Sequence, residues 1–582
     1  MRLLTAPLLL AMLMACSPAP APGEAPPPQV AWSASGQVAD DLLVAEGYHR
    51  QALSKAHDYL TREHLLEVPL TDSLVAAQRD RFLETLGENR WLHGQEIAEL
   101  QEQPQLPRWR AALEGRDLGV AMEVATLVRQ RHLAWVEEHG TLAAAPAKGA
   151  ILATAQAWED ARRGWHPEEL EPPLIPMDAD LATQALLDAR TVGFDPNTQH
   201  VPPAMADIWV EGTQRTSEGL GAGFIWKDGE IAVSYIEEDS PAGRDGQLRV
   251  GDVLTRFSGP DGRWVRAQPP ERLLMFLSQV VDKAGFTIER QGETMEIFVA
   301  MPSEEEKRLF SMNKDVVRAH RESWQDAGGA LEVARIEVTF FYENGDDGHD
   351  AAQDIALALK DLEGQVDLVV LDLRRARGGA LSVALTAAGH FANGKPLLKS
   401  FGRDNRESVL ADPSPGALWS GPIQLWVGPQ TASSGEAFAE AVSSTTQSDV
   451  IGWPTFGKGT IQWRMQMDMP AARNQEPSRL GELWITIGEL RRADGASLQI
   501  HGVALDYLLP GALEEPWGER SLKDAIRPGG TEPASEGIPT LEVSGFIHPS
   551  LDDTDALPLW REAGIQAARK AGILRPTYTP QD

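Results

Sequence analysis

A strand, a turn of small polar residues and a helix follow one another between residues 422 and 442, and this block constrains the fold more than any other. Pro422–Val427 is short and rich in bulky apolar residues, which predicts a buried strand. The turn holds Ser433 and Ser434, and a helical run follows from Glu436. Unpaired backbone N–H groups and the positive end of the helix dipole would stabilise an oxyanion there. The turn is therefore a candidate site for a nucleophilic serine, although a plain polar loop fits the same residue types.

A lysine between two glycines follows further along the chain. Gly457 and Gly459 flank Lys458, and glycines permit the close backbone packing that buries a lysine stem. Full burial can lower the pKa of a lysine from about 10.4 by roughly 3–5 pH units, which makes its amine a general base near neutrality. Ser433 and Lys458 would then form a nucleophile–base pair, with Gln462 directing the amine. A solvated surface lysine is the alternative that the residue types leave open.

These two stretches resemble the catalytic blocks of the carboxyl-terminal processing peptidases, and among them the tail-specific proteases of the bacterial periplasm. The family motifs are S-A-S-A-S-E and T-F-G-K-G-T-V-Q, and the corresponding residues here are TASSGE (431–436) and TFGKGTIQ (455–462). The spacing between the two blocks also agrees. The resemblance implies that Ser433 is the nucleophile, Lys458 the base and Gln462 the side chain that orients the base. Two serines of the family motif are replaced here, by Thr431 and Gly435.

A turn after an earlier predicted buried strand, Val366–Leu373, supplies the rest of the implied site. It resembles the family's D-L-R-x-N-x-G-G loop, whose last glycine forms the oxyanion hole together with the residue after the nucleophile. The resemblance places these two donors at Gly379 and Ser434. Ala376 stands in place of the family's Asn, and Arg377 stands where Gly is frequent. Without the resemblance, the glycines here indicate only a tight strand-to-helix turn.

Residues 38–204 show the apolar periodicity of amphipathic helices, for example at 74–86, 118–136 and 181–189. The phrase FDPNTQH at 194–200 resembles the stretch by which the family leaves its helical N-terminal domain. We therefore expect a helical N-terminal domain.

Residues 214–303 become strand-like and resemble a PDZ domain of the bacterial protease type, with a groove helix expected at Pro269–Val281. A PDZ domain binds an extended C-terminus as an added strand, and the N–H groups of one loop capture its carboxylate. The resemblance places that loop at Gly219, Leu220, Gly221 and Ala222. The same glycines also fit a plain bulge or turn.

The first 37 residues predict a membrane anchor. Residues 1–15 carry one arginine and an apolar run too short to span a bilayer, as in a signal peptide. Cys16, the only cysteine of the chain, stands as in the lipobox of bacterial lipoproteins, which implies lipidation; an ordinary secretory signal is the alternative. Ser17 favours the outer over the inner membrane under the lipoprotein sorting rule. Residues 17–37 are rich in Pro and Ala and predict a semi-rigid tether.

Composition excludes several other classes of function. A length of 582 residues gives room for several domains, and 42% hydrophobic with 24% charged residues is typical of globular proteins. The formal net charge of −32 argues against nucleic acid as a partner, because phosphates attract basic surfaces. H-E-x-x-H, P-loop and G-x-S-x-G motifs do not occur, so we expect no metal and no cofactor.

We therefore expect a multidomain α+β fold with a helical N-terminal domain, a PDZ domain and an α/β Ser/Lys protease core. The expected segments are 1–16 (signal peptide), 17–37 (tether), 38–204 (helical domain), 214–303 (PDZ), 330–512 (protease core) and 513–582 (tail). The expected function is that of a lipid-anchored serine endopeptidase of the bacterial periplasm, whose polypeptide substrates are recognised by their C-termini. An adaptor lipoprotein is a candidate partner.

Two other functions fit parts of the sequence. A catalytically silent PDZ lipoprotein that acts as a scaffold or adaptor would account for the altered loop at 375–377. A solute-binding lipoprotein would account for the tether but for none of the catalytic blocks.

Overall fold

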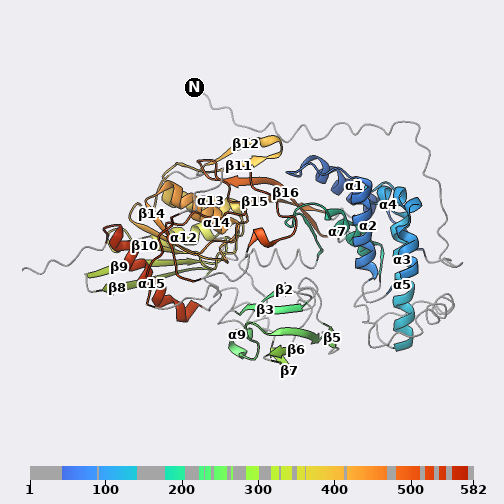
Figure 1. The fold of residues 1–582 in the computed structure, drawn as a ribbon, viewed down its shortest axis with the longest axis horizontal. Coiled ribbons are helices and arrows are strands. Elements are labelled where there is room, and N and C mark those ends of the chain that lie inside the picture. Colours follow the sequence, from blue (N-terminus) through green and yellow to red (C-terminus); the bar gives the residue numbers. More distant parts are fainter. Residues whose placement is uncertain are drawn as a thin grey trace, which may run out of the picture.

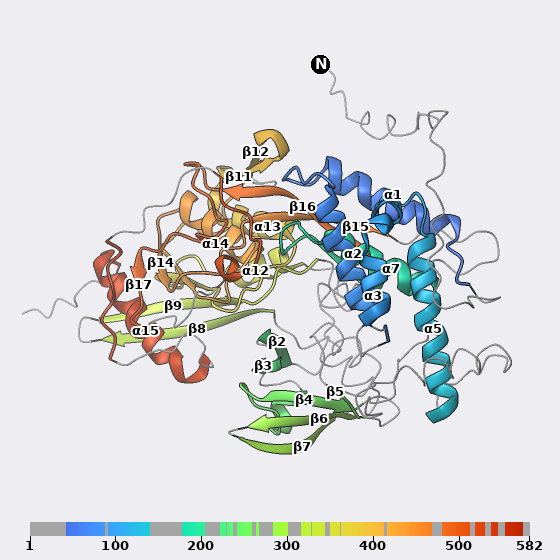
Figure 2. The ribbon, with the colours of Figure 1, turned by 45° about the vertical axis from the view of Figure 1, so that its right-hand side comes forward.

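The computed structural model describes residues 42–573 apart from internal gaps, of which the longest are 140–176, 204–221, 267–282, 301–315 and 468–479. A group of helices lies at one end, a mixed body of strands and helices at the other, and a small sheet below them (Figure 1). The view of Figure 2 keeps the same three parts apart.

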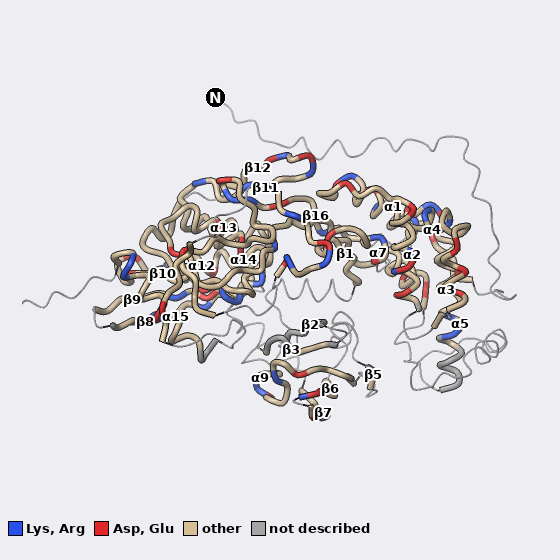
Figure 3. The backbone as a smooth tube through the Cα atoms, in the orientation of Figure 1, with Lys and Arg blue, Asp and Glu red and all other residues tan. Residues whose placement is uncertain are grey.

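The described helices of the first part share one apolar core. They are α1 (Gly47–Arg62), α2 (Asp72–Gly87), α3 (Gly94–Gln101), α4 (Leu106–Leu113), α5 (Gly119–His139) and α7 (Ala179–Thr191). Phe82 of α2 and Trp109 of α4 are fully buried in this core, and the burial of Phe82 agrees with the amphipathic pattern predicted for residues 74–86. Both acidic and basic residues occur on these helices (Figure 3), and the Arg131–Glu96 ion pair links α5 to α3.

A five-stranded sheet connects the helices to the mixed body. Its strands are β1 (Gln199–Val201), β11 (Pro396–Gly402), β12 (Glu407–Ala411), β15 (Thr460–Gln466) and β16 (Glu482–Arg491). Leu483 and Ile485 of β16 belong to the core of the helices, whereas Leu490 belongs to the core of the mixed body. The helical core therefore extends beyond the expected segment 38–204, because strands from much later in the chain complete it.

A six-stranded sheet forms the centre of the mixed body, in the order β17-β14-β13-β10-β9-β8. Its strands are β8 (Val317–Asp326), β9 (Gly329–Val338), β10 (Leu368–Asp372), β13 (Ile423–Val427), β14 (Ser448–Gly452) and β17 (Tyr507–Leu508). Every neighbouring pair is parallel except β8 and β9. The helices α12 (Ala351–Leu359), α13 (Leu381–Ala392) and α14 (Ser434–Thr445) pack in the same core. The two strands predicted as buried, β10 and β13, are buried along their whole length.

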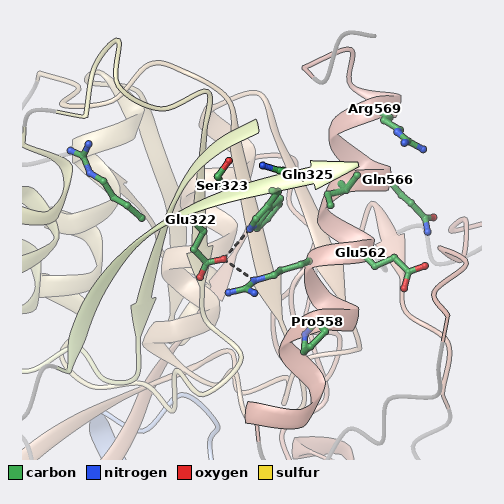
Figure 4. A pocket seen from close by; sticks show the side chains of 11 residues that line it. Glu322, Ser323, Gln325, Pro558, Glu562, Gln566 and Arg569 are labelled. Carbon is green, nitrogen blue, oxygen red and sulfur yellow. Dashed lines mark hydrogen bonds and ion pairs between the residues drawn. The ribbon is translucent and has the colours of Figure 1, made fainter. Parts of the chain in front are cut away.

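Elements on both sides of the expected core, 330–512, join this body. β8 precedes it and pairs with β9, and the helix α15 (Asp553–Lys570) lies in the expected tail. Glu322 of β8 accepts hydrogen bonds from Trp324 Nε1 at 2.9 Å and from Arg561 Nε of α15 at 2.8 Å (Figure 4). A pocket of about 790 Å³ lies between β8 and α15. Trp560 of α15 is buried in an apolar core that it shares with Trp324 of β8.

The third part is a small sheet with its own apolar core. Its elements are β2 (Ala222–Lys227), β3 (Glu230–Ile236), α9 (Pro241–Asp245), β4 (Val253–Ser258), β5 (Trp264–Arg266), β6 (Lys283–Arg290) and β7 (Glu293–Ala300). Asp252 is buried and pairs with Arg290 through two hydrogen bonds of 2.6 and 2.7 Å, which tie β6 to the loop before β4.

Several expected features fall outside the described residues. They are Cys16, the signal peptide, the tether, the PDZ groove helix Pro269–Val281 and three of the carboxylate-loop residues, Gly219, Leu220 and Gly221; Ala222 begins β2. In the part of the chain that the structure describes, no helix is both long and apolar enough to cross a membrane.

Candidate active site

Ser433 lies at the sharp turn between β13 and α14, as the sequence predicts. Its backbone has φ 54° and ψ −120°, a conformation that non-glycine residues rarely adopt. Thr431 holds the turn: its Oγ1 donates to Leu373 O at 2.8 Å and accepts from Gly428 N at 2.9 Å. Such strain persists only where the surroundings impose it, and here it presents Ser433 at the N-terminus of α14.

The two predicted oxyanion donors lie on adjacent turns. The Ser434 hydroxyl donates to Gly379 O at 2.8 Å, which joins the turn after β10 to the turn after β13. Gly379 has φ 124°, and a Cβ there would lie 2.3 Å from Phe341 O, so only glycine fits. Within the described residues, neither the Gly379 N–H nor the Ser434 N–H donates a hydrogen bond. Both are therefore available beside Ser433.

The departures from the family motif fit one another in space. Ala376 is buried, and its carbonyl oxygen accepts from Ala432 N at 2.9 Å. A Cβ at Gly435 would lie 2.4 Å from that oxygen and 3.1 Å from the Ala376 Cβ. The small residues Ala376 and Gly435 thus let the two turns approach closely. Arg377 is exposed and donates to Gln430 Oε1 at 3.0 Å.

A buried carboxylate, Glu436, holds the loop that carries Lys458 (455–459, the lysine loop) against the turn that carries Ser433. Its Oε2 accepts from the backbone N–H groups of Ser433 and Lys458, both at 2.9 Å. Its Oε1 accepts from Thr455 Oγ1 at 2.6 Å and from Gly457 N at 2.7 Å. Burial raises the pKa of Glu436 to about 7, although these four donors lower it. The residue types alone did not single out Glu436; its place in the TASSGE block was the available signal.

Lys458 is partly buried, and its Nζ donates to Gln462 Oε1 at 2.5 Å. Burial lowers the pKa of Lys458, while the nearby carboxylates of Glu519, Asp195 and Glu436 raise it in part. A depressed pKa is what a general base of this type needs. Among the described residues no hydrogen bond joins Nζ to Ser433 Oγ. The structure thus brings Ser433, Lys458 and Gln462 together, with the amine held on Gln462.

The described residues contain no group of His, Cys, Asp and Glu side chains that could hold a metal ion. The polar groups at the site are instead a hydroxyl, an amine, an amide and backbone N–H donors, which suit acyl transfer.

Residues 332–509 match a protein family described as Peptidase family S41. This chain carries a peptidase family S41 domain. The match includes both turns and the lysine loop, and it leaves out β8 and α15. The family indicated by the sequence motifs, that of the carboxyl-terminal processing peptidases, is confirmed.

Alignments with similar proteins cover more of the chain than the S41 match does. A tail-specific protease of Haemophilus influenzae is 25% identical over 362 residues, which cover 60% of this chain and 48% of that protein. A carboxy-terminal-processing protease of Bartonella bacilliformis is 24% identical over 374 residues, which cover 61% of this chain and 76% of that protein. The chain thus spans about half the length of the Haemophilus protein. The solved structure of a photosystem II D1 C-terminal processing protease covers 65% of this chain and 92% of its own, with 18% identity and a TM-score of 0.43.

Proposed function

We propose that this chain is a serine peptidase in which Ser433 is the nucleophile and Lys458 the general base. The observation that carries the proposal is the arrangement around Glu436. One carboxylate oxygen binds the backbone of both Ser433 and Lys458, while two unpaired N–H groups, of Gly379 and Ser434, lie beside the serine. A solvated surface lysine would need none of these contacts.

The proposed reaction follows from this geometry. Lys458 takes the proton of Ser433, and the serine oxygen attacks the peptide carbonyl. The N–H groups of Gly379 and Ser434 stabilise the oxyanion; donors of this kind are worth roughly 3–4 kcal/mol each in known enzymes. Lys458 then protonates the leaving amine, and water releases the acyl group from the serine. Gln462 orients the lysine amine during these steps.

The amine must come within hydrogen-bond reach of Ser433 Oγ while it keeps Gln462 as a partner. We propose that substrate bound to residues 214–303, acting as a PDZ domain, favours this arrangement. The chain would be held at the periplasmic face of a membrane, preferably the outer one, through lipidated Cys16. Deletion of residues 214–303 should then slow cleavage of a polypeptide substrate, and an unchanged rate would contradict the coupling.

Activity is tested with purified protein that lacks residues 1–16, as wild type, Ser433→Ala and Lys458→Ala. Each is incubated with a loosely folded reporter protein that ends in small apolar residues. We expect the wild type to degrade the reporter and both variants to leave it intact, which also excludes a contaminating protease. If all three bind the reporter's C-terminus and none cleaves it, the scaffold function replaces this proposal.

The anchor is tested separately by fractionation of cells that express the full chain. We expect wild type in the membrane fraction and Cys16→Ser in the soluble fraction. Equal distribution of the two proteins would contradict lipidation at Cys16.

A further inference from the structure

A chain of polar side chains runs from the lysine loop into the helical part of the molecule. Gln462, which accepts from Lys458, donates through Nε2 to Thr486 Oγ1 at 3.1 Å. Thr486 Oγ1 donates to Asp195 Oδ1 at 2.8 Å. Asp195 Oδ2 accepts from His64 Nε2 at 2.9 Å. Thr486 lies on β16, Asp195 just before β1 and His64 just after α1, so the chain joins segments that are far apart in the sequence.

The distal members of this chain are removed from solvent. Asp195 is 3% exposed, and His64 and Thr486 are 0% exposed. Burial raises the pKa of Asp195, but hydrogen bonds from His64, Thr198 and Thr486 outweigh it and hold the pKa below its usual value. His64 Nε2 lies 2.9 Å from Asp195 Oδ2, and because an ionised carboxylate can only accept, the ring carries a hydrogen on Nε2; His64 Nδ1 lies 3.0 Å from both the backbone N and the backbone O of Leu66. Asp195 is thus an ionised acceptor.

An acceptor at the end of the chain fixes the direction of every hydrogen bond in it. The single hydroxyl hydrogen of Thr486 is committed to Asp195, so its oxygen is free to accept from the Gln462 amide. The other Gln462 N–H is taken by Thr460 Oγ1 at 3.0 Å. With both N–H groups of Gln462 used, its Oε1 must face Lys458. A reversed amide would present N–H groups to the amine and give it no acceptor.

We propose that Asp195 and Thr486 are positioning residues, which fix the orientation of the Gln462 amide and through it the position of the Lys458 amine. This inference rests on the proposed function and deepens it. Part of the control over the general base then comes from the helical part, because Asp195 is itself held there by His64. The S41 match, residues 332–509, includes Thr486 but neither Asp195 nor His64.

Thr486 can be replaced by a side chain of nearly the same size, so the substitution tests the hydrogen bonds of its hydroxyl and not its packing. Thr486→Val keeps the shape but removes the hydroxyl, so the Gln462 amide loses one of its two N–H partners. We expect kcat to fall about tenfold with little change in KM, because substrate contacts are untouched. Thr486→Ser restores a hydroxyl at the same place and should recover most of the lost kcat. Thermal melting of both proteins shows whether each is folded at the assay temperature.

Asp195 has a matched control in the same part of the molecule. Asp195→Asn introduces an amide that can donate to Thr486 and turn its hydroxyl, so we expect a fall in kcat of about tenfold or more. Asp180 accepts in the same way from a second buried histidine, His49, at 2.8 Å, but it takes no part in the series of hydrogen bonds that leads to Gln462. Asp180→Asn should therefore keep the wild-type kcat even where it lowers the melting temperature.

The outcomes separate this inference from the proposed function. Loss of kcat in Thr486→Val and Asp195→Asn, with recovery in Thr486→Ser, supports the inference. If the wild type cleaves and Thr486→Val cleaves equally fast, the inference is wrong and the proposed function stands. If Thr486→Ser is as slow as Thr486→Val, packing rather than the hydroxyl is responsible, and the inference is also wrong. A wild type that cleaves nothing and whose Ser433 does not react with a fluorophosphonate overturns the proposed function and the inference together.

Discussion

Glu436 accepts four hydrogen bonds that join the turn carrying Ser433 to the loop carrying Lys458, and its ionisation should be visible in the stability of the protein. Its pKa is raised from 4.5 to about 7 in the folded chain. Between these values the folded state binds more protons than the unfolded state, so the free energy of unfolding falls as pH rises. In the wild type this effect lowers the free energy of unfolding by roughly 2–3 kcal/mol between about pH 4.5 and 7, and we expect Glu436→Gln to remove this pH dependence.

Urea denaturation at several pH values measures this slope. Glu440, buried further along α14 with a pKa also raised to about 7, contributes a slope that stays in the Glu436→Gln variant. Glu84→Gln, at an exposed position of α2, serves as a control that should keep the whole wild-type slope. A larger stability loss at high pH than at low pH in Glu436→Gln would show that the four hydrogen-bond donors of Glu436 dominate over its burial.

Gly435 is a second residue-scale test, because it lets two turns touch. A methyl group at this position would meet the Ala376 carbonyl at 2.4 Å, and a backbone atom cannot move aside as a side chain can. We expect Gly435→Ala to lower the free energy of unfolding by about 1–3 kcal/mol and to reduce kcat by displacing the oxyanion turn. Gly94→Ala has open space around it and should change neither quantity by much. Equal behaviour of the two variants would contradict the close contact.

At the scale of secondary-structure elements, α15 should be required by the S41 domain although it lies outside the matched region. Trp560 contacts Trp426 and Trp453, with ring centres 5.3 Å apart in each case. The Arg374 guanidinium lies 4.8 Å above the Trp560 ring and pairs with Asp372, at the end of β10 from which the turn carrying Gly379 begins. The helix thus supports the strand end from which that turn begins.

Trp560→Ala should lower the free energy of unfolding by about 3–5 kcal/mol, because it removes a large, fully buried side chain. We also expect kcat to fall, because Arg374 loses the Trp560 ring as a partner. This fall should be measured at a temperature at which the variant is still folded. Trp463→Ala, a truncation of a residue that is 43% exposed, is the control and should cost much less. A Trp560→Ala protein with wild-type stability would show that α15 does not dock in solution as it does here.

At the scale of the whole molecule, the apolar cores predict how the chain unfolds. β16 contributes to the core of the helices and to that of the mixed body, so these two parts should unfold together. The small sheet has a separate core and should give its own transition. Asp252→Ala breaks a buried ion pair and should shift only the transition of the small sheet, whereas Leu483→Ala should shift only the shared transition.

Scanning calorimetry of the wild type and both variants measures these shifts. Hydrogen exchange assigns each transition to its residues, because amides of the part that opens first lose protection first. A single transition that moves in both variants would contradict the separation of the small sheet from the rest.

The tertiary structure explains what the sequence could not decide about the site. The replacements Ala376 and Gly435 are far apart in the sequence, and only the fold shows that they meet. Thr486 and His64 were not singled out in the sequence, and the FDPNTQH stretch that contains Asp195 indicated a domain boundary rather than a role for this side chain. Their roles depend on hydrogen bonds between segments separated by more than a hundred residues. The division into parts was also incomplete, since β16 and α15 complete cores that begin elsewhere in the chain.

The local elements around the site follow from the sequence alone: the buried strands β10 and β13, the turns after them, and the helix that begins at Ser434. Their signals are short-range, because apolar periodicity, glycines at tight turns and motif spacing are set by neighbouring residues. The docking of the Lys458 loop on Glu436, and the hydrogen bonds from the helical part to Gln462, depend on the tertiary fold. Those contacts form when distant segments are buried together, and burial is a property of the whole fold.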